Sequence, residues 1–300
     1  MSNLGTSLAA SPVAQASVPA VAGSASTTSA PVLRGHLHLV AAARPTGETQ
    51  IARQSFRAPF HLSKPYWDGH VLQAQIVNST AGILAGDELE VDIAVKSGAA
   101  LSVTTPAAAR AFMMRSGAAL CRQHFTVGAG AWLEYLPEPL YPHADSNYAQ
   151  RTRLDLASGA DAFFVDQLAP GRVGRGECWA WRRLRLGLEV VHDGRLLLRE
   201  QLDSSGPELA RLAAFHGMPE AWFATAVIAS PTLTADAPVW EQVRALHRDG
   251  VLCGVTALVP GVWITRLLSP TGLALRDALA ALRSVLSPLL PALRTDLRKL

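Results

Sequence analysis

Cysteine is scarce in this chain of 300 residues. The three cysteines, Cys121, Cys178 and Cys253, are an odd number, lie far apart and form no CxxC pair. This spacing argues against a disulfide framework and against a structural zinc site built on paired cysteines. A reducing compartment fits such cysteine usage best, and we therefore expect a cytoplasmic protein.

Long apolar runs and clusters of one charge are also missing. No apolar run approaches the ~18 residues that a membrane span requires. The net charge is +3 without any long basic run, which gives no reason to expect binding to nucleic acid or to an anionic membrane. With 49% hydrophobic residues the chain can still bury a full core. We expect a soluble protein with no nucleic-acid and no membrane partner.

The common signatures of catalysis are absent. The chain has no GxSxG, HExxH, Walker A or paired-cysteine motif, and no GxGxxG at a strand-to-helix junction. The loop Gly171–Glu177 is rich in glycine but lacks the Lys-Ser/Thr pair that completes a phosphate-binding loop. We therefore expect a protein that is not an enzyme and has no nucleotide site of its own.

Residues Met1–Pro31 carry no charge and are about half alanine and serine. Such a segment cannot bury enough apolar surface to offset its ordering entropy. The sequence therefore predicts a disordered extension over residues 1–31 and a single β-rich domain over residues 32–300.

A strand pattern dominates the stretch Thr80–Pro106. Apolar residues alternate with polar ones from Glu88 to Val95, which is typical of a strand with one buried and one solvated face. Lys96–Ala99 contains Gly98, which accepts the positive φ of a tight turn, and we expect Leu101–Thr105 to be the return strand.

The same strand-turn-strand unit recurs further along the chain. Gly-Ala pairs at Gly98, Gly130 and Gly159 follow one another at intervals of about 30 residues, a period typical of stacked, solenoid-like arrays. The alternative is that Gly-Ala is merely a common hairpin dipeptide in an alanine-rich chain. Stacking predicts that the three turns lie close together on one side of the protein.

The remaining elements complete a mainly β prediction: stacked, helically arranged strands with a few α-helices, mostly C-terminal. Prolines indicate irregular loops at Pro59–Pro65 and Leu136–His143. Leucines at steps of four and three residues predict an amphipathic helix over Thr271–Leu286. Shorter helices are predicted at Ala107–Ser116, Glu208–Phe215 and Val239–His247.

Acidic residues and one histidine at turns and loops are the candidate metal ligands. These are Asp87, Glu134, Glu138, His143, Asp145 and Glu177. Oxygen and imidazole donors could bind a divalent cation weakly, and nickel accepts such ligands. Alternatively, Asp87 and Glu177 accept hydrogen bonds from nearby backbone N–H groups and fix their loops.

Several motifs in this order resemble the urease accessory protein UreD family, also called UreH. They are Ala81–Leu89 (AGILAGDEL), Gly98-Ala99, Thr104–Pro106 (TTP), Gly130–Pro137 (GAWLEYLP) and Gly171–Glu177 (GRVGRGE). The resemblance implies a helical stack of β-strands and a non-enzymatic scaffold. It also implies action with UreF and the GTPase UreG on the urease apoprotein in GTP-dependent nickel insertion. The candidate ligands would then line a transient nickel path, with no permanently bound cofactor.

Two other functions remain open from the residues alone. The first is a β-solenoid hydrolase in which two loop carboxylates act as acid and base. The second is a purely structural β protein that binds a partner and has no metal path. A continuous polar channel inside the protein would separate the scaffold from the purely structural alternative.

Overall fold

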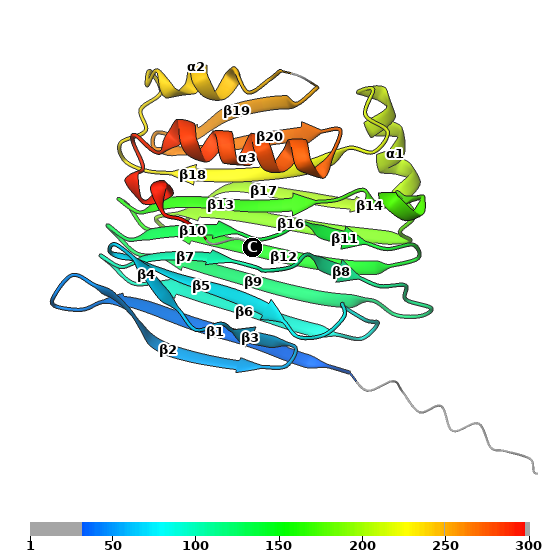
Figure 1. Cartoon of the computed structure of the whole chain (residues 1–300), viewed down its shortest axis with the longest axis horizontal. Helices are drawn as coiled ribbons and strands as arrows, with labels where there is room; N and C mark the ends of the chain where they lie inside the picture. The colour runs from blue at the N-terminus through cyan, green and yellow to red at the C-terminus, as the bar shows by residue number, and fades with distance from the viewer. Residues whose placement is uncertain (1–31, 249, 298–300) are drawn as a thin grey trace, which may run out of the picture. The chain divides into compact units, whose positions relative to one another are not determined.

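Two β-sheets form the body of the protein in a computed structural model, which describes residues 32–248 and 250–297 (Figure 1). The disordered extension predicted for residues 1–31 lies outside the described residues. No helix in the described part of the chain is long and apolar enough to cross a membrane.

The first sheet has seven strands in the order β17-β16-β12-β9-β6-β1-β2. Its five central strands are parallel, whereas β2 and β17 pair antiparallel with β1 and β16. The bounds are β1 (Arg34–Ala43), β2 (Thr49–Arg57), β6 (Glu88–Val95), β9 (Ala119–Val127), β12 (Asn147–Leu156), β16 (Arg183–His192) and β17 (Arg195–Ser204).

The second sheet has eleven strands, and β5, β7, β10 and β13 form its parallel centre. Its main path is β19-β20-β18-β13-β10-β7-β5-β3, and β4, β8 and β11 pair alongside it. The bounds are β3 (Phe60–Leu62), β4 (Tyr66–Asp68), β5 (Val71–Asn78), β7 (Ala100–Thr104), β8 (Ala109–Ala111), β10 (Trp132–Leu136), β11 (Leu140–Pro142), β13 (Asp161–Leu168), β18 (Trp222–Ala229), β19 (Leu252–Val259) and β20 (Val262–Ser269). A separate pair consists of β14 (Gly171–Arg172) and β15 (Glu177–Cys178).

The predicted Gly-Ala turns carry the chain from the first sheet to the second. Gly98, Gly130 and Gly159 all have positive φ, at 74°, 63° and 74°. The N–H of Gly130 donates to the carbonyl of Gly159 at 2.9 Å, and the N–H of Gly128 donates to that of Val95 at 2.9 Å. Turns of successive repeats are therefore hydrogen-bonded to one another, and the predicted stacking is confirmed.

The expectation that Leu101–Thr105 returns beside the preceding strand is wrong. β6 pairs with β1 and β9 in the first sheet, while β7 pairs with β5 and β10 in the second. In a stack of repeats each strand finds its hydrogen-bond partners in the neighbouring repeats, so the two strands that flank a turn need not pair with each other.

Apolar side chains from both sheets fill the space between them. The predicted inward residues of β6, from Leu89 to Val95, are at most 3% exposed. The rings of Phe125, Tyr135 and Phe164 meet at centroid distances of 4.6 to 5.1 Å across the interior. Alternation thus predicted the buried face correctly.

Helices cover the outer face of the second sheet. α3 (Gly272–Leu286) lies across β18 and β20 (Figure 1) and buries Leu275, Leu279, Leu282 and Leu286, as predicted. In α2 (Val239–Arg244), Trp240 stacks on Trp263 of β20 at 3.9 Å. The other helical segments are α1 (Gly206–Phe215) and the 3-10 turns η1 (Val173–Arg175) and η2 (Pro291–Arg294).

The predicted helix over Ala107–Ser116 is not formed. Its centre is strand β8, which pairs with β11 and, through Ala111, with Ile83 of the preceding loop. Alanine favours a helix by only ~0.5 kcal/mol per residue over most residue types. The hydrogen bonds between stacked loops outweigh that preference. The same stacking places the short strands β3 and β11 inside segments that prolines had predicted to be irregular.

Candidate functional site

Glu134 lies on strand β10 and not on a loop. Its side chain faces α3, is 0% exposed and forms an ion pair with Arg283, whose Nε lies 2.6 Å from Oε1. Ser102 donates a further hydrogen bond to Oε2 at 3.1 Å. A buried carboxylate with a bidentate cation and a hydroxyl donor is well compensated. Glu134 therefore fixes α3 on the sheet.

Asp87 is buried at the turn that precedes β6. Its Oδ2 accepts the N–H of Leu84 at 2.8 Å, and burial raises the pKa of the carboxyl. This hydrogen bond is of the kind expected from the alternative prediction for Asp87, in which the carboxylate fixes its loop and does not bind a metal.

His143 and Glu177 lie near each other where the long loops stack, and Asp145 follows two residues after His143. Burial, and next the positive charge of Arg172, lower the pKa of His143, whose ring lies 4.8 Å from that of Phe112. Glu177 is paired with Arg172, whose Nε lies 2.8 Å from Oε2, and this arginine lowers the pKa of Glu177. Asp145 is exposed and has a φ of 56°.

The described residues contain no group of three or more His, Cys, Asp or Glu side chains placed to hold a metal ion. The predicted ligands instead occupy separate positions: the first-loop turn, the helix-covered face of the second sheet, and the stacked loops. Glu138 differs from the others because it borders two hollows.

A cavity of about 510 Å³ lies between the two sheets. Gln123 and Gln150 reach its wall from the first sheet, and Tyr135 and Asp166 from the second, with Tyr148 beside them. Apolar residues make up most of the remaining wall. The cavity is therefore mostly apolar, with polar side chains from both sheets in its wall. We call the five polar residues named above the polar strip.

Hydrogen bonds connect this polar strip into a network. Thr152 donates to Gln123 at 3.2 Å, and Gln150 Nε2 lies 3.4 Å from both Thr152 Oγ1 and Asp166 Oδ1. Tyr148 donates its hydroxyl to Gln150 Oε1 at 3.1 Å. Burial raises the pKa of Asp166 to about 6, and the contact with Gln150 opposes this shift. The network therefore surrounds a carboxylate that keeps its proton to a higher pH than an exposed aspartate, because its pKa is raised.

Three carboxylates border the cavity among the described residues: Glu138, Asp166 and Glu200. Glu200 forms an ion pair with Arg266 of β20. Asp166 faces the cavity from β13, and its hydrogen-bond partner is the neutral amide of Gln150. A cation in the cavity would thus meet its negative charge chiefly at Asp166.

A second hollow of about 650 Å³ runs beside α3 and adjoins the first. Glu138 and Gln167 line both. Gln167 donates to the carbonyl of Pro137 at 2.6 Å, and the N–H of Glu138 donates to Thr105 Oγ1 at 2.8 Å. The two hollows therefore share these two residues in their walls.

Asp166 was not among the predicted ligands, although the sequence carried a signal for it. Ala162, Phe164 and Leu168 lie on the face of the strand that points to the interior, and Asp166 lies on the same face. A carboxylate on an otherwise apolar strand face is expensive unless it has a role. The predicted ligands were residues at turns and loops, and Asp166 lies within a strand.

Oxygen donors at the wall of an apolar cavity can bind a divalent cation weakly. A bare cation would face a prohibitive desolvation cost in a purely apolar interior. One carboxylate with amide and hydroxyl oxygens offers fewer charged ligands than a closed metal cage, so such a cation would bind and leave again.

Fold and site together define a two-sheet β-solenoid with a helical cover and a polar strip inside an apolar cavity. The family described as UreD urease accessory protein matches residues 33–298. The chain is 54% identical over 269 residues to "Urease accessory protein UreD" of Opitutus terrae, covering 89% of this chain and 98% of that protein. It is 31% identical over 285 residues to "Urease accessory protein UreD 2" of Streptomyces griseus, covering 90% and 94% of the two chains. A UreD of Anaeromyxobacter is 32% identical over 265 residues, covering 84% and 87%. The chain belongs to the UreD family of urease accessory proteins.

Proposed function

We propose that this protein is a non-enzymatic scaffold that acts with UreF and UreG in the GTP-dependent insertion of nickel into the urease active site. The observation that carries the proposal is the family match over residues 33–298, together with 54% identity to a urease accessory protein UreD along 98% of its length. Its partners would be UreF-like and UreG-like proteins and the urease apoprotein, in the cytoplasm. GTP hydrolysis would reside in the UreG-like partner, since no phosphate-binding motif occurs in this sequence.

Nickel is the cargo in this proposal and passes through the cavity between the sheets. Asp166 would supply the interior charge, and Glu138 would receive the ion where the cavity meets the hollow beside α3. Of the remaining predicted ligands, His143, Asp145 and Glu177 would stand at the stacked loops. Asp87 and Glu134 would act by holding the loop and helix that frame the path.

The hydrolase alternative would also use carboxylates that face one cavity. The family assignment favours the accessory role, because the relatives reported above carry the name of accessory proteins. The purely structural alternative gives no reason for a costly interior carboxylate such as Asp166.

Co-expression with a urease apoprotein tests the proposal. Urease subunits, UreF and UreG would be produced with and without this chain, and nickel bound per purified urease would be measured by elemental mass spectrometry. We expect nickel loading and urease activity only when the chain is present. Replacing GTP by a non-hydrolysable analogue in a reconstituted mixture should abolish loading. Equal loading without the chain would refute the proposal.

A further inference from the structure

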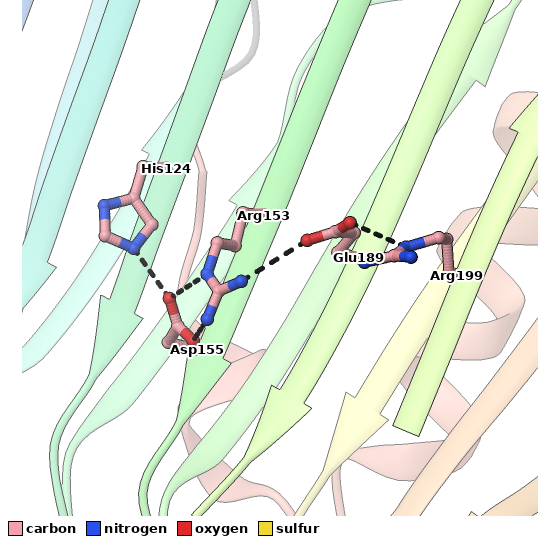
Figure 2. Close-up of polar contacts among 5 residues, drawn as sticks. All are labelled: His124, Arg153, Asp155, Glu189 and Arg199. Atoms are coloured by element: carbon pink, nitrogen blue, oxygen red, sulfur yellow. Dashed lines mark hydrogen bonds and ion pairs between the residues drawn. The ribbon is translucent and has the colours of Figure 1, made fainter. Parts of the chain in front are cut away.

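The solvent-facing side of the first sheet carries rows of charged residues that run across its strands. One row is a connected network (Figure 2). His124 Nε2 lies 2.7 Å from Asp155, and Arg153 contacts that carboxylate at 2.8 and 2.9 Å and Glu189 at 3.3 Å. Arg199 contacts Glu189 at 2.8 Å. Charges in this row are satisfied within the protein.

The neighbouring row differs, because the arginines at the centre of the sheet have no acidic partner in the part of the chain that the structure describes. Arg122 of β9 stands in register with Arg151 of β12, and Arg151 stands in register with Gly187 of β16. Arg185 lies on the same face, two residues before Gly187. Within the described residues, no carboxylate comes within 4.0 Å of Arg122, Arg151 or Arg185. We call these three the arginine patch.

The carboxylates nearest in register are engaged elsewhere. Glu90 stands opposite Arg122, but its Oε1 lies nearer to His38, at 3.4 Å from Nε2, without a hydrogen bond between them. Asp203 stands opposite Arg185, but Arg183 holds it through two contacts of 2.8 Å. Arg185 acts on Asp203 only through its charge at longer range. This charge lowers the pKa of Asp203, but by less than the hydrogen bonds from Arg183 do.

This arrangement costs stability. Like charges that stand directly opposite each other on neighbouring strands repel. The buried Nε of Arg185 also has no hydrogen-bond partner in the described structure. A fold under selection for stability alone would place a carboxylate opposite Arg151 on β16, as it places Glu189 opposite Arg153 in the row of Figure 2.

Gly187 adds an independent observation, because its backbone does not require glycine. A Cβ built there would meet its nearest atoms at 3.8 and 3.9 Å, which is ordinary van der Waals contact. Glycine inside a strand costs roughly 0.5–1 kcal/mol and often marks a place where another backbone approaches closely. The missing side chain leaves a gap on the outer face beside Arg151 and Arg185, which we call the Gly187 recess.

We propose that the arginine patch and the Gly187 recess form a docking surface for an acidic segment of a partner protein. Carboxylates of that segment would pair with the three guanidinium groups, whose planar donors suit bidentate contacts, and its backbone would pass over Gly187. A nucleic acid fits less well, because Glu90, Asp155 and Glu189 flank the patch and would repel a continuous row of phosphates. The inference does not depend on the nickel path.

Peptide binding by the full chain tests this surface. The probe is a fluorescently labelled oligoglutamate peptide, followed by anisotropy at low salt, with oligoglutamine as the blank. The triple variant Arg122→Gln, Arg151→Gln, Arg185→Gln should bind the probe at least about tenfold more weakly. Its melting temperature should stay equal or rise, because a repulsion is removed.

A matched control removes the same charge from the edges of the same sheet. Arg53→Gln, Arg57→Gln and Arg195→Gln together should change affinity by no more than about twofold. A comparable loss in this control would show that net charge alone attracts the peptide and would overturn the proposal. So would unchanged binding by the patch variant.

Two further measurements fix the geometry and the class of partner. Gly187→Val should weaken binding while the fold stays intact or becomes more stable, because the added side chain fills the recess. Unchanged affinity in this variant would overturn the role of the recess. Tighter binding of duplex DNA than of oligoglutamate, lost in the patch variant, would overturn the assignment to an acidic protein.

Discussion

Replacing Asp166 with asparagine should stabilise the folded protein at neutral pH. The side chain keeps its size and an oxygen that can accept the hydrogen bond from Gln150, but it loses the buried charge. Burial raises the pKa of Asp166 from its ordinary value of 3.8 to about 6. With about 1.4 kcal/mol for each unit, ionised Asp166 costs the fold at most about 3 kcal/mol.

The pH dependence has a definite sign. The folded protein holds the Asp166 proton more tightly than the unfolded chain does, so protonation of Asp166 stabilises the fold. This stabilisation is complete below pH 3.8 and is lost as pH rises through about 6. The asparagine variant does not titrate at this position. The difference in unfolding free energy between the variant and the parent should therefore grow from about pH 4 to about pH 6 and then level off.

Urea unfolding at a series of pH values measures this difference. Asp92→Asn is the matched control, because it makes the same change on the outer face, where the Asp92 side chain is 45% exposed. We expect a difference that grows with pH only for Asp166→Asn. A variant that is destabilised at neutral pH, or offset from the parent equally at all pH values, would refute the reasoning.

Three further outcomes follow from the contacts described above. Glu134→Gln should cost roughly 3–5 kcal/mol of unfolding free energy, since it leaves the buried Arg283 without its charged partner; a loss under ~1 kcal/mol in chemical unfolding would contradict a fixing role. Glu177→Gln should cost no more than about 1 kcal/mol, because its pair with Arg172 is partly exposed. The pKa of Glu177 is lowered in the folded state, so this difference should be present above pH 4.5 and vanish as pH falls; persistence in acid would contradict the ion-pair explanation. Deleting residues 1–31 should leave the melting temperature unchanged, and a clear drop would contradict the sequence-based prediction that the segment does not pack.

Sequence periodicity predicted the local elements well because strand faces and helix faces are set by neighbouring residues. The alternation from Glu88 to Val95, the glycines at the turns and the leucine spacing of α3 each predicted the observed element. The sheet that each strand joins could not be predicted in this way. A tight glycine turn serves a hairpin and a crossing between sheets equally well, and hydrogen bonds to other repeats decide between them.

The candidate site was less accessible to sequence reasoning because it depends on contacts between distant residues. Glu134 finds its partner Arg283 149 residues further along the chain. Asp166 faces the cavity together with Gln150, although the two residues lie on strands of different sheets. The nickel route through these groups remains a proposal.

Nickel delivery by the Asp166→Asn variant tests the proposed route most directly. The variant, the Asp92→Asn control and the parent would each be co-expressed with urease, UreF and UreG. Nickel per urease would be measured at equal levels of folded protein and of co-purified complex. The proposed path predicts that nickel loading falls for Asp166→Asn and is unchanged for Asp92→Asn. Full nickel loading by Asp166→Asn, in an intact complex, would contradict it.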